Sequence, residues 1–426
     1  MTSVESELTR GVLPAAELRE RLGISPATLM RRVREAGPSL VRIGRGRATR
    51  YALQQPWPTL DRSRFPVFRV TETGGAVPAG DLITLAARQS VWMPEGRISD
   101  GLPIEIADAR PSGFLGRHFA AIHADLRLPA RLADWSDQHI LLAMSRRGED
   151  LPGDLLVGDE SFARWQALED EDASRGAYPG LADATIAGHP PGSSAGGEQP
   201  KFGACVGGRH VLVKFAARGG DTDVVARRWS DLLILEDLAL KVVRSRDIPA
   251  ARTQVIGTPT HWFLESERFD RVGLRGRRAV LSLAAIHDDA ADSWARAATL
   301  LERAGRLGAD DARYVRWLDG FGALIGNTDR HQYNVLFFVD GPGPRFAPAF
   351  DQVSMLYAPT ADGRVPPREF SVPYATSDTL DVWADALDAA REYWARGSDD
   401  ARVSDVVRTI CARNASALAR TSSGRP

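Results

Sequence analysis

The chain has 426 residues, of which 43% are hydrophobic and 26% are charged, and its formal net charge is −1 at pH 7. This composition is ordinary for a soluble globular protein, and the balanced charge excludes a chain that binds polyanions along its whole length. Cys205 and Cys411 are too few for a disulfide framework or a thiolate zinc site. No apolar run approaches the ~18 residues that span a bilayer, and we expect a cytoplasmic protein of two or three domains without a membrane partner.

Residues 1–58 predict a winged helix-turn-helix. Leucine, isoleucine and valine recur at helical spacing on either side of Gly23, and Ser25-Pro26 supplies an N-cap followed by a proline at the first helical position. The alternating apolar and basic residues of 40–53 then predict a β-hairpin. Residues 54–58, QQPWP, are expected to be a linker.

The first 55 residues contain ten arginines and five glutamates, so this segment taken alone is cationic. Such a charge suits phosphate contacts on both sides of a helix in the major groove of DNA. The residues that we expect to contact DNA are Arg31 and Arg32 on the second helix and Arg45 and Arg47 on the wing. The alternative is a module that binds protein and whose arginines form a solvated face.

A β-hairpin with lysines at both ends is predicted downstream of a long, weakly patterned region. Residues 59–175 indicate only a strand end near 151–158 and an acidic helix or loop near 161–175, and the Gly/Pro/Ser-rich stretch 188–197 predicts a loop. Residues 202–206 and 211–215 then alternate around Gly207-Gly208, with Lys201 and Lys214 at the ends. Only three of the 54 basic residues are lysines, which indicates a need for a compact ammonium group where one is kept.

The next strong pattern is a polar insert in an apolar region. Residues 223–243 predict a helix, and residues 261–270 predict a strand with its exit. The chain from about residue 290 is predicted to be mainly helical. Within it, residues 327–334 form an insert that is nearly all polar. The flanking runs 335–339 and 345–350 predict a hairpin, and centring it between residues 342 and 343 places Asn334 opposite Asp351, with α-carbons ~5 Å apart. An amide and a carboxylate oxygen at this separation suit Mg²⁺, and Asp329 enters the same end of the hairpin.

The order of these residues is the one that protein kinases use for phosphoryl transfer. We expect Asp329 to accept the proton of the acceptor hydroxyl, Asn334 and Asp351 to hold the metal, and Lys214 to reach the phosphates. Glycines of the 188–197 loop offer backbone N–H groups that can approach phosphate closely. The alternative is that Asp329 and Asp351 are turn and strand-exit residues and that Lys214 is an edge lysine.

Five segments, SSAGGEQPKFG, VLVKFA, SERFDR, IGNTDRHQYN and FAPAFDQVS, resemble in this order the HipA-like kinases, the toxins of bacterial toxin–antitoxin modules. The resemblance covers about residues 190–360. It implies an α+β, two-lobed protein-kinase-like fold of the HipA type that uses ATP and Mg²⁺ to phosphorylate serine or threonine in a protein. It also implies that Asp329 is the catalytic base, that Asn334 and Asp351 bind the metal, and that Ser194 is autophosphorylated. The cofactor-binding residues that we expect are Gly196, Gly197, Glu198, Gln199, Lys201, Lys214, Glu267, Arg268, Phe269, His331, Asn334 and Asp351.

The sequence departs from this family in two places. Typical members carry Asn-Glu on the helix after the phosphate-binding lysine, but this chain has Arg227-Arg228, which leaves Asp231 and Glu236 as candidate partners of Lys214. The usual relative also has no DNA-binding module of its own and borrows one from its antitoxin. We therefore expect a winged helix-turn-helix in residues 1–58, an N-terminal kinase lobe in 59–270 and a C-terminal lobe in 271–426, with DNA, an antitoxin and a protein substrate as partners.

Three other functions stay open at this point. Small-molecule kinases have similar loops. A metal-dependent nuclease could use His331 with Asp329 and Asp351. A DNA-binding regulator could use a kinase-like domain only to sense nucleotide.

Overall fold

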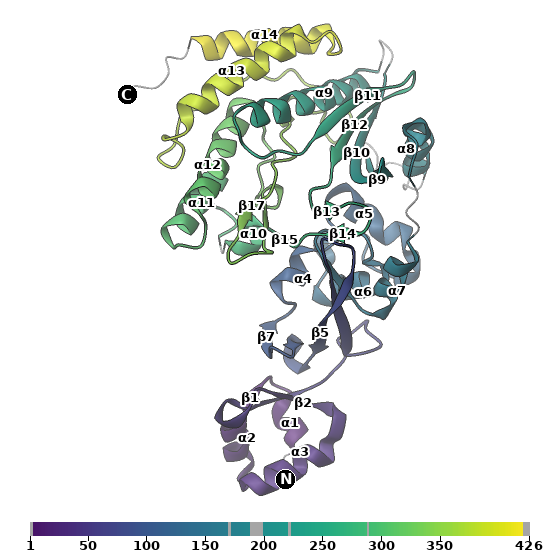
Figure 1. The fold of residues 1–426 in the computed structure, drawn as a ribbon, viewed down its shortest axis with the longest axis vertical. Helices are drawn as coiled ribbons and strands as arrows, with labels where there is room; N and C mark the ends of the chain where they lie inside the picture. The colour runs from purple at the N-terminus through teal and green to yellow at the C-terminus, as the bar shows by residue number, and fades with distance from the viewer. Residues whose placement is uncertain (1–2, 169–171, 188–198, 220–222, 288, 421–426) are drawn as a thin grey trace. The chain divides into compact units, whose positions relative to one another are not determined.

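The structure is a computed structural model and describes residues 3–168, 172–187, 199–219, 223–287 and 289–420. The chain forms two compact units (Figure 1). Unit 1 comprises residues 1–71, 75–111 and 123–169, and unit 2 comprises 72–74, 112–122 and 170–426. The predicted boundaries after residues 58 and 270 do not coincide with this division, so the domain limits stay a prediction. Among the described residues, no helix is long and apolar enough to cross a membrane.

Residues 3–53 form the N-terminal module of unit 1. Gly23 ends the first of two successive helices with a φ of 62°, and the side chain of Ser25 caps the next helix by accepting the backbone N–H of Thr28 at 3.2 Å. A three-stranded sheet has the order β1-β3-β2, and the predicted hairpin is confirmed by the pairs Leu40↔Leu53 to Ile43↔Arg50. The elements are α1 (Val4–Leu8), β1 (Leu13–Pro14), α2 (Ala15–Leu22), α3 (Pro26–Ala36), β2 (Leu40–Ile43) and β3 (Arg50–Leu53).

The rest of unit 1 is built on a five-stranded sheet, of which the sequence indicated only the strand end near residues 151–158. Its order is β7-β6-β5-β4-β8, and its register shifts between Pro66 and Phe68. Proline and glycine inside strands weaken the alternating pattern by which strands are recognised, and Pro66, Pro78 and Gly80 all lie in β4 or β5. The elements are β4 (Arg64–Val70), β5 (Ala76–Thr84), β6 (Gln89–Met93), β7 (Arg97–Asp100), α4 (Ile104–Asp108), α6 (Asp137–Arg147), β8 (Leu155–Val157) and α7 (Asp159–Ala167).

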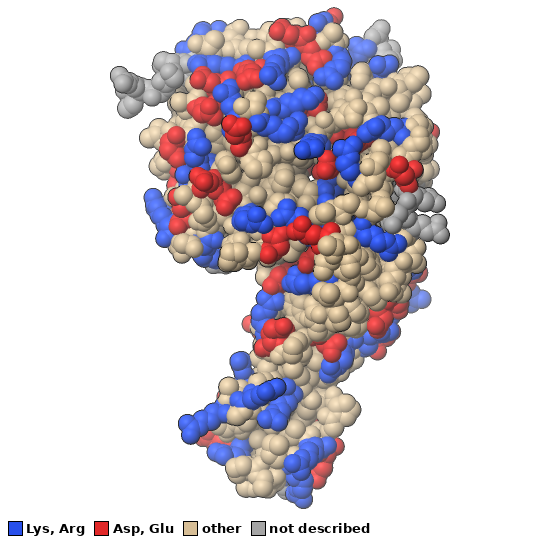
Figure 2. Space-filling model, viewed as in Figure 1, with Lys and Arg blue, Asp and Glu red and all other residues tan. Residues whose placement is uncertain are grey.

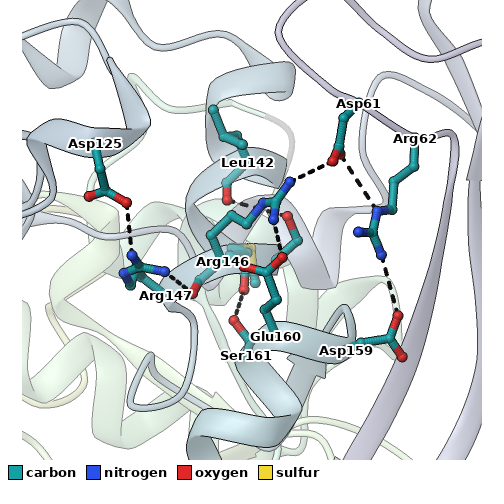
Figure 3. Close-up of polar contacts among 11 residues, drawn as sticks. Asp61, Arg62, Asp125, Leu142, Arg146, Arg147, Asp159, Glu160 and Ser161 are labelled. Carbon is teal, nitrogen blue, oxygen red and sulfur yellow. Dashed lines mark hydrogen bonds and ion pairs between the residues drawn. The ribbon is translucent and has the colours of Figure 1, made fainter.

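The predicted linker at 54–58 is wrong, because this segment is fastened to the five-stranded sheet. Trp57 is 5% exposed within the apolar core of that sheet, and its indole N–H donates to the carbonyl of Leu85 at 3.1 Å. The segment that follows is held by charges (Figure 3): Arg146 pairs with Asp61 at 2.8 Å and also with Glu160. The N-terminal module and the sheet are therefore continuous within unit 1.

Unit 2 contains a four-stranded sheet of order β11-β12-β10-β9. The predicted hairpin is confirmed: Val206 pairs with Arg209 and Lys201 with Lys214, and Gly207 and Gly208 form the turn with φ of 59° and 71°. These positive φ values are typical of a two-residue turn that suits glycine. The elements are α5 (Gly113–Ile122), α8 (Tyr178–Ala187), β9 (Lys201–Val206), β10 (Arg209–Ala217), α9 (Val224–Ser245), β11 (Thr253–Gly257) and β12 (His261–Glu267).

The remainder of unit 2 is mainly helical, and its core is built on aromatic side chains. Trp294, Trp317 and Trp394 are each at most 1% exposed, and α13 and α14 lie side by side near the C-terminus (Figure 1). The elements are β13 (Arg271–Val272), β14 (Gly276–Arg277), β15 (Val280–Ser282), α10 (Leu283–Ile286), α11 (Trp294–Arg303), α12 (Ala309–Leu324), β16 (Leu336–Phe338), β17 (Arg345–Phe346), α13 (Trp383–Asp399) and α14 (Asp405–Ala419).

The hairpin of β16 and β17 forms, but its predicted register is wrong by two residues. Phe337 pairs with Phe346, so Asn334 and Asp351 are not strand partners. A shift of two residues keeps every side chain on the same face, so the apolar pattern could not distinguish the two registers. Asn334 instead lies in the short 3₁₀ turn Gln332–Asn334, before the strand.

Candidate active site

The alternation of β10 places Lys214 on the face of the sheet that α9 covers. Its strand neighbours Val213 and Phe215 pack into an apolar cluster on the opposite face. The Lys214 ammonium lies 2.7 Å from each carboxylate oxygen of Glu236 on α9, and it also contacts the carboxylate of Asp351. Glu236 is therefore the partner that the sequence left open.

Asp231, the other candidate, has a different role. Its two carboxylate oxygens accept the backbone N–H of Ser404 at 2.7 Å and the hydroxyl of Ser404 at 2.6 Å. Ser404 is the N-cap of α14. Asp231 thus fastens α9 to the beginning of α14 and does not contact Lys214.

Opposite charges shift the ionisation of this cluster. Burial raises the pKa of Asp351, but the positive charges of Lys214 and Lys201 outweigh burial and lower that pKa to about 2. Burial raises the pKa of Glu236, and the nearby Lys214 offsets this only in part. Although burial lowers the pKa of Lys214, the two carboxylates raise it above its ordinary value. At neutral pH the ammonium and the Asp351 carboxylate are therefore charged.

Lys201 adds a second positive charge to this face. It is the direct cross-strand partner of Lys214, and it is half-buried. Like charges in directly opposite positions of a sheet repel each other, so a site of this kind favours anions between the two ammonium groups. The arrangement fits a polyphosphate in addition to the carboxylates that are present.

Asp329 lies in a loop after α12 that is fixed by asparagines on both sides. The buried side chain of Asn327 accepts the backbone N–H of Asp329 at 3.0 Å, and the side-chain amide of Asn334 donates to the carbonyl of Asp329 at 3.0 Å. The Asp329 carboxylate itself is 56% exposed and lines a cavity of about 330 Å³. The loop thus holds a carboxylate open to an incoming substrate.

Asn327 was missed as a site residue, because its position in a polar loop also fits an ordinary turn. Besides holding Asp329, its amide lies 3.5 Å from the carbonyl of Asp351. Asn327 therefore contacts the backbone of both aspartates. Its being one of only three asparagines in the chain was the available signal.

The residues predicted to bind Mg²⁺ have suitable chemistry. Asp351 is held at a φ of 56°, a left-handed conformation that is uncommon outside glycine and is found at functional sites, and its side chain is 30% exposed. The Asn334 amide nitrogen is engaged by Asp329, which leaves the amide oxygen for a cation. In the part of the chain that the structure describes, no group of three or more His, Cys, Asp or Glu residues could hold a metal ion. Mg²⁺ does not need one, since it commonly takes one or two protein ligands beside phosphates and water.

The remaining predicted cofactor residues fall into three groups. The first group follows strand β12, which ends at Glu267. Arg268 donates two hydrogen bonds to the Asp270 carboxylate, at 3.1 and 3.0 Å. The ring of Phe269 lies 5.8 Å from that of Phe350, the residue before Asp351. The second group has two members. The His331 side chain is 51% exposed, and its Nε2 lies 3.9 Å from Asp329 Oδ1. Gln199 is buried and donates to the carbonyl of Trp229 at 3.5 Å. Gly196, Gly197, Glu198 and the predicted phosphorylation site Ser194 lie outside the described residues.

The predicted DNA-contacting arginines lie in unit 1. Arg45 and Arg47 are exposed in the turn between β2 and β3, and within the described ranges neither has an ion pair. On α3, Arg31 is exposed and its Nε lies 3.8 Å from Glu35 Oε1, whereas Arg32 is half-buried. Figure 2 shows basic side chains gathered on the N-terminal module at the lower end of the view.

Comparison with known proteins extends these observations to the whole chain. Residues 61–166 match the middle domain of the YjjJ-like toxins, and residues 193–418 match the HipA-like C-terminal domain. The Toxin YjjJ of Escherichia coli (strain K12) is 33% identical over 434 residues, which cover 96% of each protein. A chain in the Shewanella oneidensis MR-1 complex of HipA, HipB and operator DNA aligns with 82% of this chain and 95% of its own length, at a TM-score of 0.54 and 14% identity. The chain therefore belongs to the HipA-like toxin family, and its α+β, two-lobed kinase-like fold is of the HipA type.

Proposed function

We propose that this protein is an ATP- and Mg²⁺-dependent serine/threonine protein kinase whose N-terminal module, a winged helix-turn-helix, binds DNA. The observation that carries the kinase proposal is the contact of Lys214 with both Glu236 and Asp351 in unit 2. Protein kinases require two features together: a lysine that pairs with a glutamate on a helix, and a metal-binding aspartate. Here Glu236 is that glutamate, and Asp351, which follows a hairpin, is that aspartate.

Each residue of the site has a role in this proposal. Lys214 and Lys201 would hold the phosphates, Asn334 and Asp351 would hold Mg²⁺, and Glu236 fixes the Lys214 ammonium from behind. When bound, Mg·ATP supplies the phosphoryl group and the positive charge that offsets its oxygens. Asp329 accepts the proton of the acceptor hydroxyl, and Asn327 and Asn334 keep its backbone in place for that transfer.

Metal dependence tests the site most simply. In Asp351→Asn we expect transfer from ATP at saturating Mg²⁺ to fall by about 10²-fold or more, because the amide lacks the charge that a hard cation prefers. Chelation of Mg²⁺ should stop transfer by the unaltered protein, and added Mg²⁺ should restore it. Asp362→Asn is the matched control, since Asp362 pairs only with its neighbours Thr360 and Arg364 in the described structure. Transfer that survives chelation would contradict the proposal.

The DNA proposal predicts a strong dependence on salt. We expect the affinity of the full chain for double-stranded DNA to fall as salt rises, and Arg45→Ala to reduce the slope of log K against log[salt] by about 1. Arg21→Ala is the control, because Arg21 pairs with Glu17 at 2.5 Å and with Glu7 at 3.8 Å. Equal salt slopes for Arg45→Ala and Arg21→Ala would show that Arg45 in the wing does not contact DNA.

The related structure suggests a further partner. Its HipA chain was solved with HipB and operator DNA, and we propose that this chain likewise meets an antitoxin protein. The identity of that protein, like the phosphorylation of Ser194 and the choice of protein substrate, stays a prediction.

The alternative functions have less support. A nuclease would need His331, Asp329 and Asp351 around one metal, and the described residues contain no such group. Plasmid nicking that needs no ATP and survives Lys214→Ala would favour it. Phosphate found on a metabolite and on no protein would favour a small-molecule kinase. ATP binding without transfer would favour a regulator that senses nucleotide.

A further inference from the structure

Asp319 and Arg330 connect α12 to the loop that carries Asp329. The Arg330 Nε donates to Asp319 Oδ1 at 3.0 Å, and another guanidinium N–H donates to the carbonyl of Asn327. The second oxygen of Asp319 accepts the backbone N–H of Ala295 at 3.1 Å, in the first turn of α11. Asp319 is 7% exposed. One buried carboxylate thus joins two helices to the loop.

Gly322 gives Arg330 its path across α12. A Cβ at this position would lie 2.8 Å from Arg330 Cδ, which is closer than two carbons can approach without a shift. The side chain of Arg330 therefore passes directly over the helix backbone before it reaches Asp319. A residue with a Cβ at position 322 therefore requires the Arg330 side chain, whose guanidinium is held by Asp319 and Asn327, to shift.

We propose that Asp319, Gly322 and Arg330, here called the α12 lock, position the carboxylate of Asp329 for proton transfer. Arg330 is the next residue after Asp329, so the direction in which its side chain is held fixes the backbone on which Asp329 stands. Asp319, Asp329 and Arg330 line the same cavity. The three lock residues are positioning residues and not catalytic ones. The inference rests on the proposed kinase function and identifies the residues that hold its catalytic base, Asp329, in position.

The lock predicts that its variants change kcat much more than the KM for ATP. In the full chain, Arg330→Gln, Asp319→Asn and Gly322→Ala should each lower kcat by roughly 10- to 100-fold, because displacement of a reacting group by about 1 Å can cost 10² in rate. The KM for ATP should change much less than kcat, since Lys214 and Glu236 do not contact the lock. Arg330→Lys, which keeps a positive charge, should retain more activity than Arg330→Gln.

Arg316→Gln is the matched control. Arg316 also lies on α12 and is 12% exposed, but it pairs with Glu302 at 2.5 Å and Asp381 at 3.0 Å and takes no part in the loop. We expect it to lower stability without changing kcat. A fall in kcat of the same size in Arg316→Gln and Arg330→Gln would overturn the lock, because the effect would then be a general loss of helix packing.

Hydrogen exchange of the peptide covering residues 326–335 separates this inference from the kinase proposal. Faster amide exchange in Arg330→Gln and Gly322→Ala, but not in Arg316→Gln, would support the lock even if the unaltered protein transferred no phosphate. Exchange equal to that of the unaltered protein would overturn it. Absence of transfer by the unaltered protein would contradict the kinase proposal alone.

Discussion

Replacing Asp329 by asparagine is expected to lower the rate of phosphoryl transfer by roughly 10²- to 10⁴-fold, the usual contribution of a general base. Asparagine has nearly the same shape but cannot take the proton of the acceptor hydroxyl. The Asp329 side chain is 56% exposed and its backbone contacts do not depend on the carboxylate, so the fold should persist. The measurement is the initial rate of transfer from ATP, with thermal unfolding recorded beside it.

The control for this variant is Asp310→Asn, which alters an exposed aspartate in the first turn of α12. Its rate should equal that of the unaltered protein. If Asp329→Asn also kept its full rate, Asp329 would lose its role as base. The search for the base would then move to the neighbouring His331.

Replacing Lys214 by methionine should have the largest effect on stability. The change leaves the buried carboxylate of Glu236 and the partly exposed carboxylate of Asp351 without the ammonium that both contact. Loss of one partner of a buried ion pair typically costs about 3–5 kcal/mol of unfolding free energy. Phosphate binding should be lost as well, since Lys214 is the residue proposed to hold the nucleotide.

The pH dependence of this loss has a definite sign. Burial already raises the pKa of Glu236 while Lys214 is present, and removal of Lys214 raises it further. As pH falls, Glu236 takes up a proton and the repulsion disappears, so the destabilisation should shrink toward acid pH. Urea unfolding at several pH values measures it.

Lys241→Met provides the comparison for Lys214→Met. Lys241 lies on α9 and pairs with the buried Asp237 at 2.7 Å, but the Lys241 side chain itself is 43% exposed, and Asp237 keeps a hydrogen bond from Thr253 at 2.8 Å. The loss should therefore be clearly smaller. A loss for Lys214→Met that is no larger, or that grows toward acid pH, would contradict the charge arrangement described here.

The sequence was sufficient where local chemistry sets the geometry. Gly207-Gly208 allows one tight turn, and that turn fixes the register that brings Lys201 opposite Lys214. In the N-terminal module, Gly23 and the Ser25 cap mark the end of one helix and the start of the next. These features depend on neighbours in the chain, so a single sequence carries them.

It was insufficient where the geometry depends on packing at long range. The turn after β16 could be centred in two ways without moving a side chain to the other face, and the one that occurs separates Asn334 from Asp351 as strand partners. Choosing Glu236 over Asp231 required knowing which face of α9 meets β10. The ion pair of Asp319 and Arg330 depends on the path of a side chain over Gly322, which no spacing in the sequence reveals.

Identification of phosphorylated residues by mass spectrometry, after the full chain is incubated with Mg·ATP, tests the central claim most directly. The site of Lys214, Glu236, Asp351 and Asp329 predicts phosphoserine or phosphothreonine in the unaltered protein and a near-complete loss of it in Asp329→Asn under the same conditions. Equal phosphorylation of the two proteins, or none in the unaltered protein with any protein acceptor offered, would contradict it.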